Sequence, residues 1–322
     1  MRQRILITGC TGYIGRHLVA HLSEAAPEAA LHGLSRSLPN PGLLRRLESH
    51  HQADLLDQQA VGDVISSLRP QAVIHLAAQK NGAWSALAAG QVVATTNLLD
   101  AVRQLLGPDI RVVVVGSSAE VGFCPPDTLP VAETAVCRPV SSYGVSKLAQ
   151  SAQAWAAYLN FRQNVVRLRL FNVIGPDLPD SLLPGRAVRL LAAGLRSSQP
   201  LHLRFGDLST SRDYTDVADV CRALCRGIER GSAGQLFHIG TGREVTGREL
   251  IQALIHNCPR PLPPVELLEE ADGFAEGVSR QAADSALARE ELGWAPRYSL
   301  AESVERMWSA VLEEVCATRP SA

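Results

Sequence analysis

The fold is decided close to the start of the chain, where residues 8–15 read Thr8-Gly9-Cys10-Thr11-Gly12-Tyr13-Ile14-Gly15. The strand-like run Ile5–Thr8 leads into them, and the helical pattern Arg16–Glu24 follows. The three glycines let a backbone turn, approach a pyrophosphate closely and pack a helix on the strand, and the helix N-terminus offers free N–H groups. This placement predicts a dinucleotide site in preference to a plain tight turn.

Strand-like and helical segments alternate through the first half of the chain. Further strands are expected at the apolar runs Leu31–Ser35, Ala72–Ala77, Arg111–Ser117 and Val165–Phe171. Helical patterns are expected at Gln58–Leu68, 86–106 and Ser142–Asn160. Such alternation predicts an α/β fold with a doubly wound parallel sheet of the Rossmann type.

The sequence changes in character after Gly175-Pro176, where prolines and short segments become frequent. We expect residues 1–174 to form the dinucleotide-binding domain. Residues 212–240 are expected to return to it, with a helix that begins near Asp216 and a strand at Gln235–Ile239. A smaller substrate-binding lobe, which closes over the carboxyl edge of the sheet, is expected to comprise residues 175–211 and 241–322.

The composition is that of an ordinary globular protein and excludes several classes of function. The 322 residues are 46% hydrophobic and 20% charged, and the net charge of −1 predicts neither a nucleic-acid partner nor a membrane surface. No apolar run reaches the roughly 18 residues of a membrane span, and the start lacks the pattern of a signal peptide, so we expect a cytoplasmic protein. The 7 cysteines show no ligand spacing, and no metal site is predicted.

The end of the second strand indicates which dinucleotide is bound. NAD-specific sites place an acid about 20 residues beyond the glycine loop, but this chain has Ser35-Arg36-Ser37 there. Arg36 can pair with a 2′-phosphate, and Ser35 and Ser37 can donate hydrogen bonds to it. NADP(H) is therefore the preferred cofactor, with NAD(H) as the alternative if Arg36 is only an exposed loop residue.

Further cofactor contacts are expected where the third and fourth strands end. Asp54 can accept a hydrogen bond from the adenine amino group, while Leu55 flanks the ring. The small residues of Leu76-Ala77-Ala78 suit a backbone that passes close to the cofactor, although a buried strand would demand the same residues. His75 is interpreted as a structural residue.

Tyr143 and Lys147 are the principal catalytic candidates. They lie four residues apart at the start of a predicted helix, so their side chains share a face. A tyrosine that exchanges protons at neutral pH needs its pKa lowered from about 10 toward 7, worth roughly 4 kcal/mol. A neighbouring ammonium together with a cationic nicotinamide ring can supply this. A lone YxxxK usually marks a solvated helix face. Downstream of a glycine loop, and with only two lysines among 31 basic residues, it predicts a catalytic pair.

A serine turn follows the valine-rich strand, in the sequence Gly116-Ser117-Ser118-Ala119-Glu120. The carboxyl edge of an open α/β sheet is where such folds bind ligands. Ser118 is therefore placed to hydrogen-bond a substrate oxygen together with Tyr143. The alternative is a plain serine turn after a strand.

Together these segments resemble the extended short-chain dehydrogenase/reductase family, also called the NAD-dependent epimerase/dehydratase family. The resemblance runs from about residue 4 to 310 and is carried by TGCTGYIG at 8–15, HLAA at 75–78, GSSAE at 116–120, YGVSK at 143–147, RLFNVIGP at 169–176, RDYTDVADV at 212–220 and ELGW at 291–294. It implies that Ser118, Tyr143 and Lys147 form a catalytic triad and that the substrate is a nucleotide-diphosphate sugar. It also implies that Asn172 and Arg212 touch that substrate, that Phe171 and Val173 lie beside the cofactor, and that helices 86–106 and 142–160 form a homodimer interface.

Within this family, the wording around GSSAE and RDYTDVADV is most similar to GDP-sugar 4-ketoreductases and 4,6-dehydratases. Glu120 matches the catalytic glutamate of the dehydratases and is expected to contact substrate, although relatives that do no dehydration also have it. The leading hypothesis is NADPH-dependent reduction of a 4-keto-6-deoxy nucleotide sugar, with Tyr143 as general acid. A 4-epimerase or 4,6-dehydratase is the close alternative. A ketoreductase for a non-sugar natural product and a non-catalytic NAD(P) sensor are more distant ones.

Three positions depart from the family pattern. Val121 stands where a tyrosine usually precedes the glycine, and Gln91 replaces the usual helix asparagine. An arginine expected near Phe274 is absent, and Arg280 is its candidate replacement.

Overall fold

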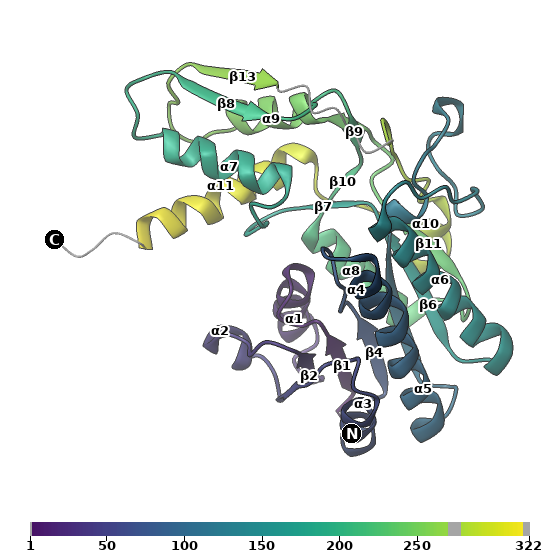
Figure 1. Cartoon of the computed structure of the whole chain (residues 1–322). Coiled ribbons are helices and arrows are strands. Elements are labelled where there is room, and N and C mark those ends of the chain that lie inside the picture. The colour runs from purple at the N-terminus through teal and green to yellow at the C-terminus, as the bar shows by residue number, and fades with distance from the viewer. Residues whose placement is uncertain (1, 270–277, 318–322) are drawn as a thin grey trace.

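Seven parallel strands form the central sheet of the computed structural model, which describes residues 2–269 and 278–317 (Figure 1). Their spatial order is β11-β6-β5-β4-β1-β2-β3. The bounds are β1 (Arg4–Thr8), β2 (Ala30–Ser35), β3 (Ser49–Gln52), β4 (Ala72–His75), β5 (Arg111–Ser117), β6 (Val165–Leu170) and β11 (Leu236–Ile239). The order reverses beside β1, as in doubly wound Rossmann folds. The predicted fold class is confirmed.

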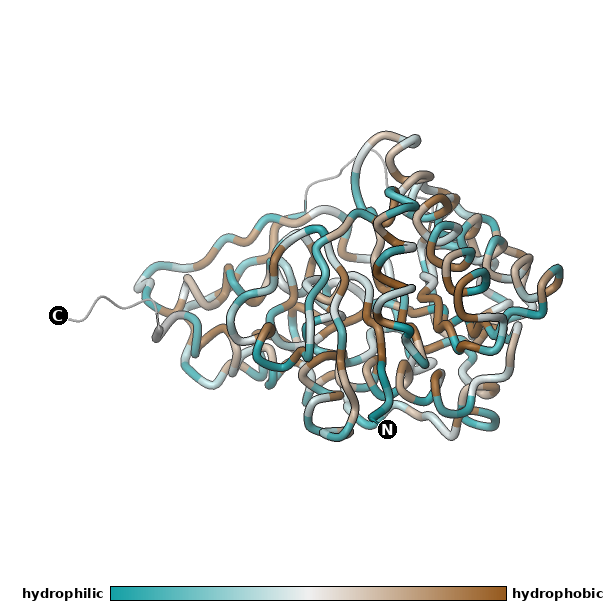
Figure 2. Tube along the Cα trace, turned by 90° about the horizontal axis from the view of Figure 1, so that it is seen from below, coloured by the Kyte–Doolittle hydropathy of each residue, from teal (hydrophilic) through white to brown (hydrophobic). Residues whose placement is uncertain are grey.

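Helices cover both faces of this sheet. On one face lie α1 (Tyr13–Ala25) and α8 (Val217–Arg230), and on the other lie α3 (Gln58–Leu68), α5 (Ala94–Leu106) and α6 (Ser142–Phe161). The valines of β5 alternate between the two cores: Val113 and Val115 belong to the first, Val112 and Val114 to the second. Along the tube in Figure 2 brown and teal alternate over the helices, as expected when one face of each is buried.

The predicted helix 86–106 is interrupted by a π-helical turn. It consists of α4 (Trp84–Ala88), the π turn η1 (Ala89–Val93) and α5. Gln91 lies in the π turn and is fully buried, where its side chain bonds both the N–H and the carbonyl of Gln79 at 2.9 and 2.5 Å. At Gly90 a Cβ would lie 2.5 Å from the Cβ of Gln79. The turn therefore clamps the loop after β4 against this helix.

Several strand ends differ from the sequence expectation by one or two residues. The third strand contains the polar residues His50 and His51 and ends at Gln52. The fourth strand ends at His75, two residues early. The predicted strand Val165–Phe171 ends at Leu170, and β7 (Asn172–Ile174) then pairs with β10 (Tyr214–Asp216) outside the main sheet. Asp216 caps α8 as predicted, with its carboxylate accepting from Ala218 N–H at 2.8 Å.

A second core lies beyond the carboxyl edge of the sheet, in the upper part of Figure 1. It is built from α7 (Leu183–Gly194), α9 (Gly247–His256), α11 (Leu300–Ala317) and the parallel pair of β8 (Leu201–Phe205) with β13 (Val265–Glu269). Short elements complete the structure: α2 (Pro41–Leu44), η2 (Ser118–Glu120), η3 (Pro126–Thr128), β9 (Ser211–Arg212), β12 (Val245–Thr246) and α10 (Ala286–Leu292). Among the described residues, no helix is long and apolar enough to cross a membrane.

One expected domain boundary is wrong. Residues 241–322 were assigned as a whole to the lobe, but Ala288, Leu292 and Trp294 are fully buried in the core shared by α1, α8 and the sheet. The indole N–H of Trp294 donates to the Asp219 carbonyl in α8 at 2.9 Å. The chain therefore returns to the dinucleotide-binding domain a second time, because α10 covers apolar surface that α8 and β11 leave open.

Candidate active site

The glycine loop that joins β1 to α1 passes so close to the backbone after β4 that only glycine fits there. Gly9 has a φ of +69°, and a Cβ there would lie 2.7 Å from the backbone nitrogen of Ala77, in the loop after β4. Gly15 packs in the same way on Gly9 and Cys10. Leu76 and Ala77 thus lie directly beside the loop, half-buried, and Ala78 is exposed.

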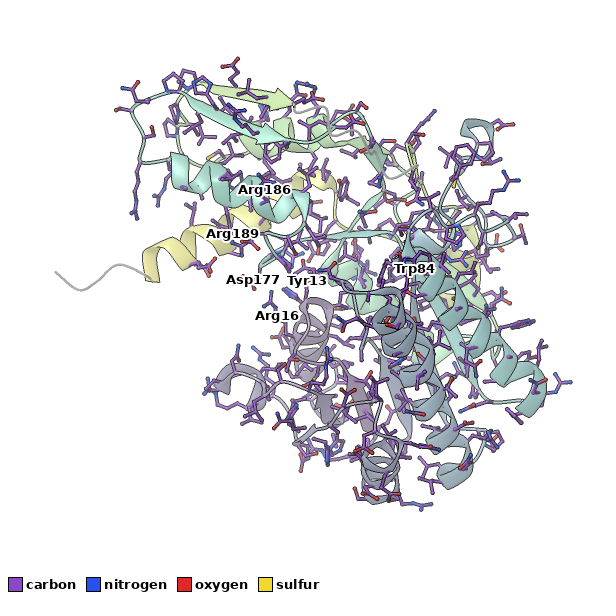
Figure 3. The ribbon with its side chains drawn as sticks, viewed as in Figure 1. Tyr13, Arg16, Trp84, Asp177, Arg186 and Arg189 are labelled. Carbon is purple, nitrogen blue, oxygen red and sulfur yellow. The ribbon has the colours of Figure 1, made fainter. Side chains whose placement is uncertain are left out.

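The N-terminus of α1 fits a pyrophosphate. Gly12 is the N-cap residue, is exposed and has no side chain to satisfy the first helical N–H groups. The N–H groups of Tyr13 and Ile14 belong to this first turn, while their side chains pack into the interior. Figure 3 shows Tyr13 and Arg16 at the junction with the lobe, where Arg16 donates to the Asp177 carbonyl at 2.7 Å.

At the end of β2 a positive charge faces solvent. Arg36 is exposed and donates to the Gln79 side chain at 3.3 Å, and exposed Ser37 meets the hydroxyl of Thr11 at 3.1 Å. Ser35 does not share this role. It is buried, and its hydroxyl donates to the Ser37 carbonyl and contacts His50 Nε2, each at 2.8 Å. Ser35 therefore shapes the turn after β2 and is not the phosphate donor that the sequence predicted.

The expected adenine contacts are only partly at the surface. Asp54 is exposed, and one carboxylate oxygen accepts from Leu56 N–H at 3.0 Å. Leu55 is 5% exposed and packs in the core with residues of α3 and α5, and its carbonyl accepts from Asn97 at 2.8 Å. The Leu55 side chain is therefore not available to flank an adenine ring, and this prediction is corrected.

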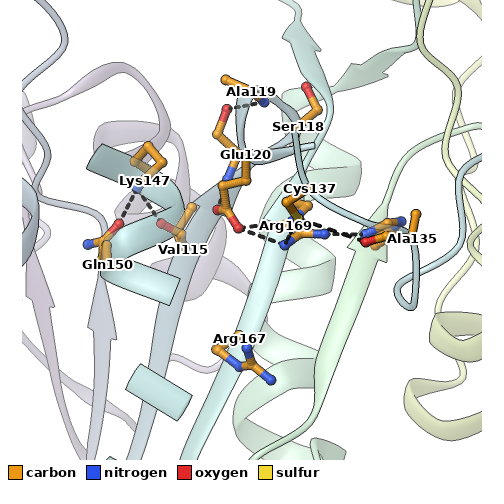
Figure 4. A network of polar contacts seen from close by, with 12 residues as sticks. Val115, Ser118, Ala119, Glu120, Ala135, Cys137, Lys147, Gln150, Arg167 and Arg169 are labelled. Atoms are coloured by element: carbon orange, nitrogen blue, oxygen red, sulfur yellow. Dashed lines mark hydrogen bonds and ion pairs between the residues drawn. The ribbon is translucent and has the colours of Figure 1, made fainter. Parts of the chain in front are cut away.

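Lys147 is buried on α6 and joins a hydrogen-bonded chain that runs to the glycine loop. Its ammonium donates to the Val115 carbonyl at 2.6 Å and to Gln150 Oε1 at 2.5 Å (Figure 4). Gln150 donates in turn to Thr95 at 2.8 Å, and Thr95 contacts His75 at 2.9 Å. Burial is the main cause that lowers the pKa of Lys147 to about 8.

His75 completes this chain. Its other ring nitrogen lies 2.7 Å from the hydroxyl of Thr8, just before the glycine loop. Burial first, and then the charge of Lys147, lowers the pKa of His75 to about 3, so the ring is neutral. The His75 ring thus links β1 to α5 through hydrogen bonds with Thr8 and Thr95.

Burial is the main influence on the pKa of Tyr143 in this structure. Tyr143 is half-buried at the start of α6, and burial raises its pKa to about 12. A hydrogen bond with Ser117 lowers the pKa and the charge of Glu120 raises it. The Lys147 ammonium, which was expected to lower this pKa, is bonded to the Val115 carbonyl and to Gln150.

Ser118 lies in the turn η2 at the carboxyl end of β5. Ser117 and Glu120 form a capping box around this turn, with Glu120 Oε1 accepting from Ser117 N–H at 2.7 Å. Ser118 is 6% exposed, and its hydroxyl points away from the Glu120 carboxylate (Figure 4).

Glu120 is committed to an internal ion pair. It is fully buried, and Oε2 accepts from Arg169 Nε at 3.0 Å and Nη2 at 2.8 Å. Arg169 also contacts His238 at 3.0 Å, and His238 N–H donates to Glu133 at 2.7 Å. Glu120 was predicted to contact the substrate. In the structure both oxygens of its carboxylate are bonded to protein groups instead. Arg169 was not among the candidates predicted from the sequence, although it is a charged residue inside the buried strand of RLFNVIGP.

The remaining candidates lie where β6, β7 and β9 end. Phe171 is buried edge-on against the His238 ring at 5.4 Å, whereas Asn172 and Val173 are half-buried. Arg212 is half-buried in β9, opposite Val245 in β12. Its neighbour Asp213 is buried and accepts hydrogen bonds from Thr241, Gly242 and Ala283.

Two of the departures from the family pattern have a structural account. Val121 is 2% exposed and packs with Cys124 and Val131. Arg280 pairs with Glu244 through Nε at 3.0 Å and Nη2 at 2.5 Å. Phe274 lies outside the described residues. No group of three or more His, Cys, Asp or Glu side chains within residues 2–269 and 278–317 could hold a metal ion.

A parallel sheet with a glycine loop before α1, and with Ser118, Tyr143 and Lys147 toward its carboxyl edge, is the arrangement of an NAD(P)-dependent enzyme of the short-chain dehydrogenase/reductase class. The chain belongs to the NAD dependent epimerase/dehydratase family, whose model matches residues 5–240. The family expected from the motifs is thereby confirmed.

Relatives with different reactions are similar over nearly the whole chain. GDP-6-deoxy-D-mannose reductase of Pseudomonas aeruginosa is 30% identical over 315 residues, covering 96% of this chain and 97% of the relative. UDP-glucose 4-epimerase of Mycolicibacterium smegmatis is 31% identical over 322 residues, covering 94% and 96%. The solved structure of RMD from Pseudomonas aeruginosa complexed with NADPH superposes with a TM-score of 0.83 at 30% identity, covering 98% of this chain and 99% of the other.

Proposed function

We propose that this chain reduces a 4-keto-6-deoxy nucleotide sugar with NADPH. Arg36 is the observation that carries the choice of reductant. An exposed guanidinium at the end of β2 suits a 2′-phosphate, at the position where an acid would select NAD. The similarity to GDP-6-deoxy-D-mannose reductase and to a structure with NADPH supports the same choice.

Each candidate residue has a role in such a reduction. When bound, NADPH supplies a hydride to the ketone carbon. Tyr143 donates the proton to the ketone oxygen. Ser118 donates a hydrogen bond to the same oxygen as negative charge develops on it. Lys147 holds a positive charge near the tyrosine, and Asn172 and Arg212 bind the sugar and the diphosphate.

The buried ion pair argues against dehydration. A 4,6-elimination of water needs a base that removes a proton beside the ketone, and Glu120 is the carboxylate at the matching position. Its two oxygens are bonded to Ser117 N–H and to Arg169. A carboxylate whose two oxygens are bonded in this way is poorly placed to reach a substrate proton.

Loss of NADPH absorbance tests the proposal. Purified protein is mixed with NADPH and GDP-4-keto-6-deoxy-mannose, the ketone that corresponds to the sugar in the name of the Pseudomonas relative. We expect turnover by the wild type and a loss of about 10²- to 10⁴-fold in Tyr143→Phe. NADPH binding to the variant, followed by fluorescence, serves as its control. No absorbance loss with GDP-, dTDP- or UDP-linked ketosugars would sink the proposal.

A 4-epimerase is the second candidate, favoured by the similarity to UDP-glucose 4-epimerase. An epimerase takes and returns its hydride within one turnover, so it keeps an oxidised dinucleotide. Mass spectrometry and absorbance of the co-purified dinucleotide separate the two reactions. Tightly held NAD⁺ with no net NADPH consumption would favour the epimerase.

We further propose a cytoplasmic homodimer. The outer surfaces of α5 and α6 expose apolar side chains: Leu105, Val145, Trp155, Leu159 and Phe161. Pairing the two helices with those of a second copy would bury them in a four-helix interface. The six free cysteines among the described residues suit a reducing compartment. Light scattering should give a dimer, and Trp155→Glu should shift it toward monomer.

A further inference from the structure

A segment near the C-terminus crosses from the lobe to the catalytic turn. We call residues 279–285 the crossing segment. At its start the Ser279 carbonyl accepts from Ser211 N–H at 2.9 Å, in the lobe strand β9. At its end the Ser285 hydroxyl donates to the Gly240 carbonyl at 2.9 Å, just after β11. The segment then enters α10, which packs on the dinucleotide-binding domain.

Two loops of the dinucleotide-binding domain hold the middle of the crossing segment. Val131 N–H donates to the Ala282 carbonyl at 2.7 Å, and Asp284 N–H donates to the Val131 carbonyl at 2.8 Å. Ala283 N–H donates to Asp213 at 3.0 Å, next to the candidate substrate residue Arg212. The crossing segment is thus fixed on both sides of Gln281.

Gln281 is the side chain that reaches the catalytic turn. It is 3% exposed, and its amide donates to the Ser118 carbonyl at 3.0 Å and to the Gly122 carbonyl at 3.3 Å. The Ser118 carbonyl also accepts from Val121 N–H at 3.0 Å, so the Gln281 amide is an additional donor to the same carbonyl. The backbone of Ser118 is therefore bonded to the crossing segment, and the direction of its hydroxyl depends on that backbone.

We propose that Gln281 is a positioning residue for Ser118, and that it links the catalytic turn to the segment that carries Arg280. Its effect on turnover rests on the proposed function, in which Ser118 binds the ketone oxygen. Gln281 touches neither the ketone nor the dinucleotide in this scheme and acts only through the turn. Removing the amide leaves the apolar packing of the turn but takes one donor from each of the two carbonyls.

The test replaces Gln281 by leucine or methionine, which keep the size of the side chain and remove its donor. Gln163→Leu is the matched control, because Gln163 is also buried and donates to a backbone carbonyl, that of Leu99, at 2.9 Å. We expect both Gln281 variants to lower kcat about 10- to 100-fold, as a misplaced catalytic group does. KM should stay within about twofold of wild type, and Gln163→Leu should leave both constants unchanged.

Two further measurements locate the effect at the turn. Amide exchange at Val121 and Gly122, whose N–H groups bond the Ser118 carbonyl, should speed up in Gln281→Leu and not in Gln163→Leu. In the Ser118→Ala background, Gln281→Leu should cost less than about twofold, because the group it positions is gone. Wild-type exchange with unchanged kcat, or full additivity of the two substitutions, would overturn the proposal. If the wild type reduces no ketosugar, the proposed function fails while amide exchange still decides the role of Gln281.

Discussion

Replacing Glu120 by glutamine tests whether this carboxylate is a structural partner or a catalytic base. The exposed fractions of the paired side chains are 3% for Arg169 and 0% for Glu120. The carboxylate accepts two hydrogen bonds from the guanidinium and one from Ser117 N–H. Glutamine can keep one acceptor, but it places an NH₂ group or a neutral oxygen against Arg169 and leaves a buried charge uncompensated.

Breaking one partner of a buried ion pair costs about 3–5 kcal/mol. With about 2–4 °C of melting temperature per kcal/mol for a domain of roughly this size, Glu120→Gln should melt about 6–20 °C below wild type. The double variant Glu120→Leu/Arg169→Leu removes both charges. It should recover part of the loss, because no charge is then left buried alone.

Calorimetry and urea unfolding at pH 7 measure the effect, with Glu229→Gln as the control, since Glu229 forms an exposed pair with Arg226. That control should change stability by less than about 1 kcal/mol. A Glu120→Gln protein with wild-type stability that has lost only a dehydratase activity would refute the reasoning. Glu120 would then be a base, and the proposed reduction would lose one of its supports.

Three other outcomes follow from the site. Arg36→Asp should raise the KM for NADPH about 10- to 100-fold and lower that for NADH, because a charge-assisted contact becomes a repulsion; an unchanged preference in steady-state kinetics would contradict this. The pKa of about 8 for Lys147 predicts that kcat/KM falls above about pH 8, where the ammonium loses its charge; residual activity of Lys147→Arg should lack that limb in a pH profile. Burial lowers the pKa of both His75 and His238 to about 3. The unfolded chain protonates them below about 6.5, so stability should fall by about 4 kcal/mol from pH 7 to 5 in urea unfolding; a flat profile would exclude this.

The fold was predictable because its signals are local. The glycine loop lies between a strand and a helix that adjoin it in sequence, and the valine run of β5 is buried on both faces, as such a run requires. Asp216 likewise marks the start of α8 by its own capping bond. The π turn at Gln91 was not predictable, because its partner Gln79 precedes it by 12 residues in a loop.

The chemistry of the site depends on contacts that sequence spacing does not contain. The spacing of Tyr143 and Lys147 indicates a shared helix face, but the ammonium turns to Val115, 32 residues away on β5. Glu120 matches a catalytic position in the motif, yet Arg169, 49 residues further on, occupies its carboxylate. Gln281 reaches Ser118 across 163 residues. Such partners are set by the order of strands in the sheet.

The second return of the chain has a consequence for any attempt to divide this enzyme. A fragment that stops after β11 would lack Trp294 and Leu292, and so would expose to water the apolar surface of α8 and β11 that they cover. Such a truncated protein is expected to aggregate. Chimeras that exchange the lobe with a relative should therefore retain residues 286–294 of the parent that supplies the glycine loop.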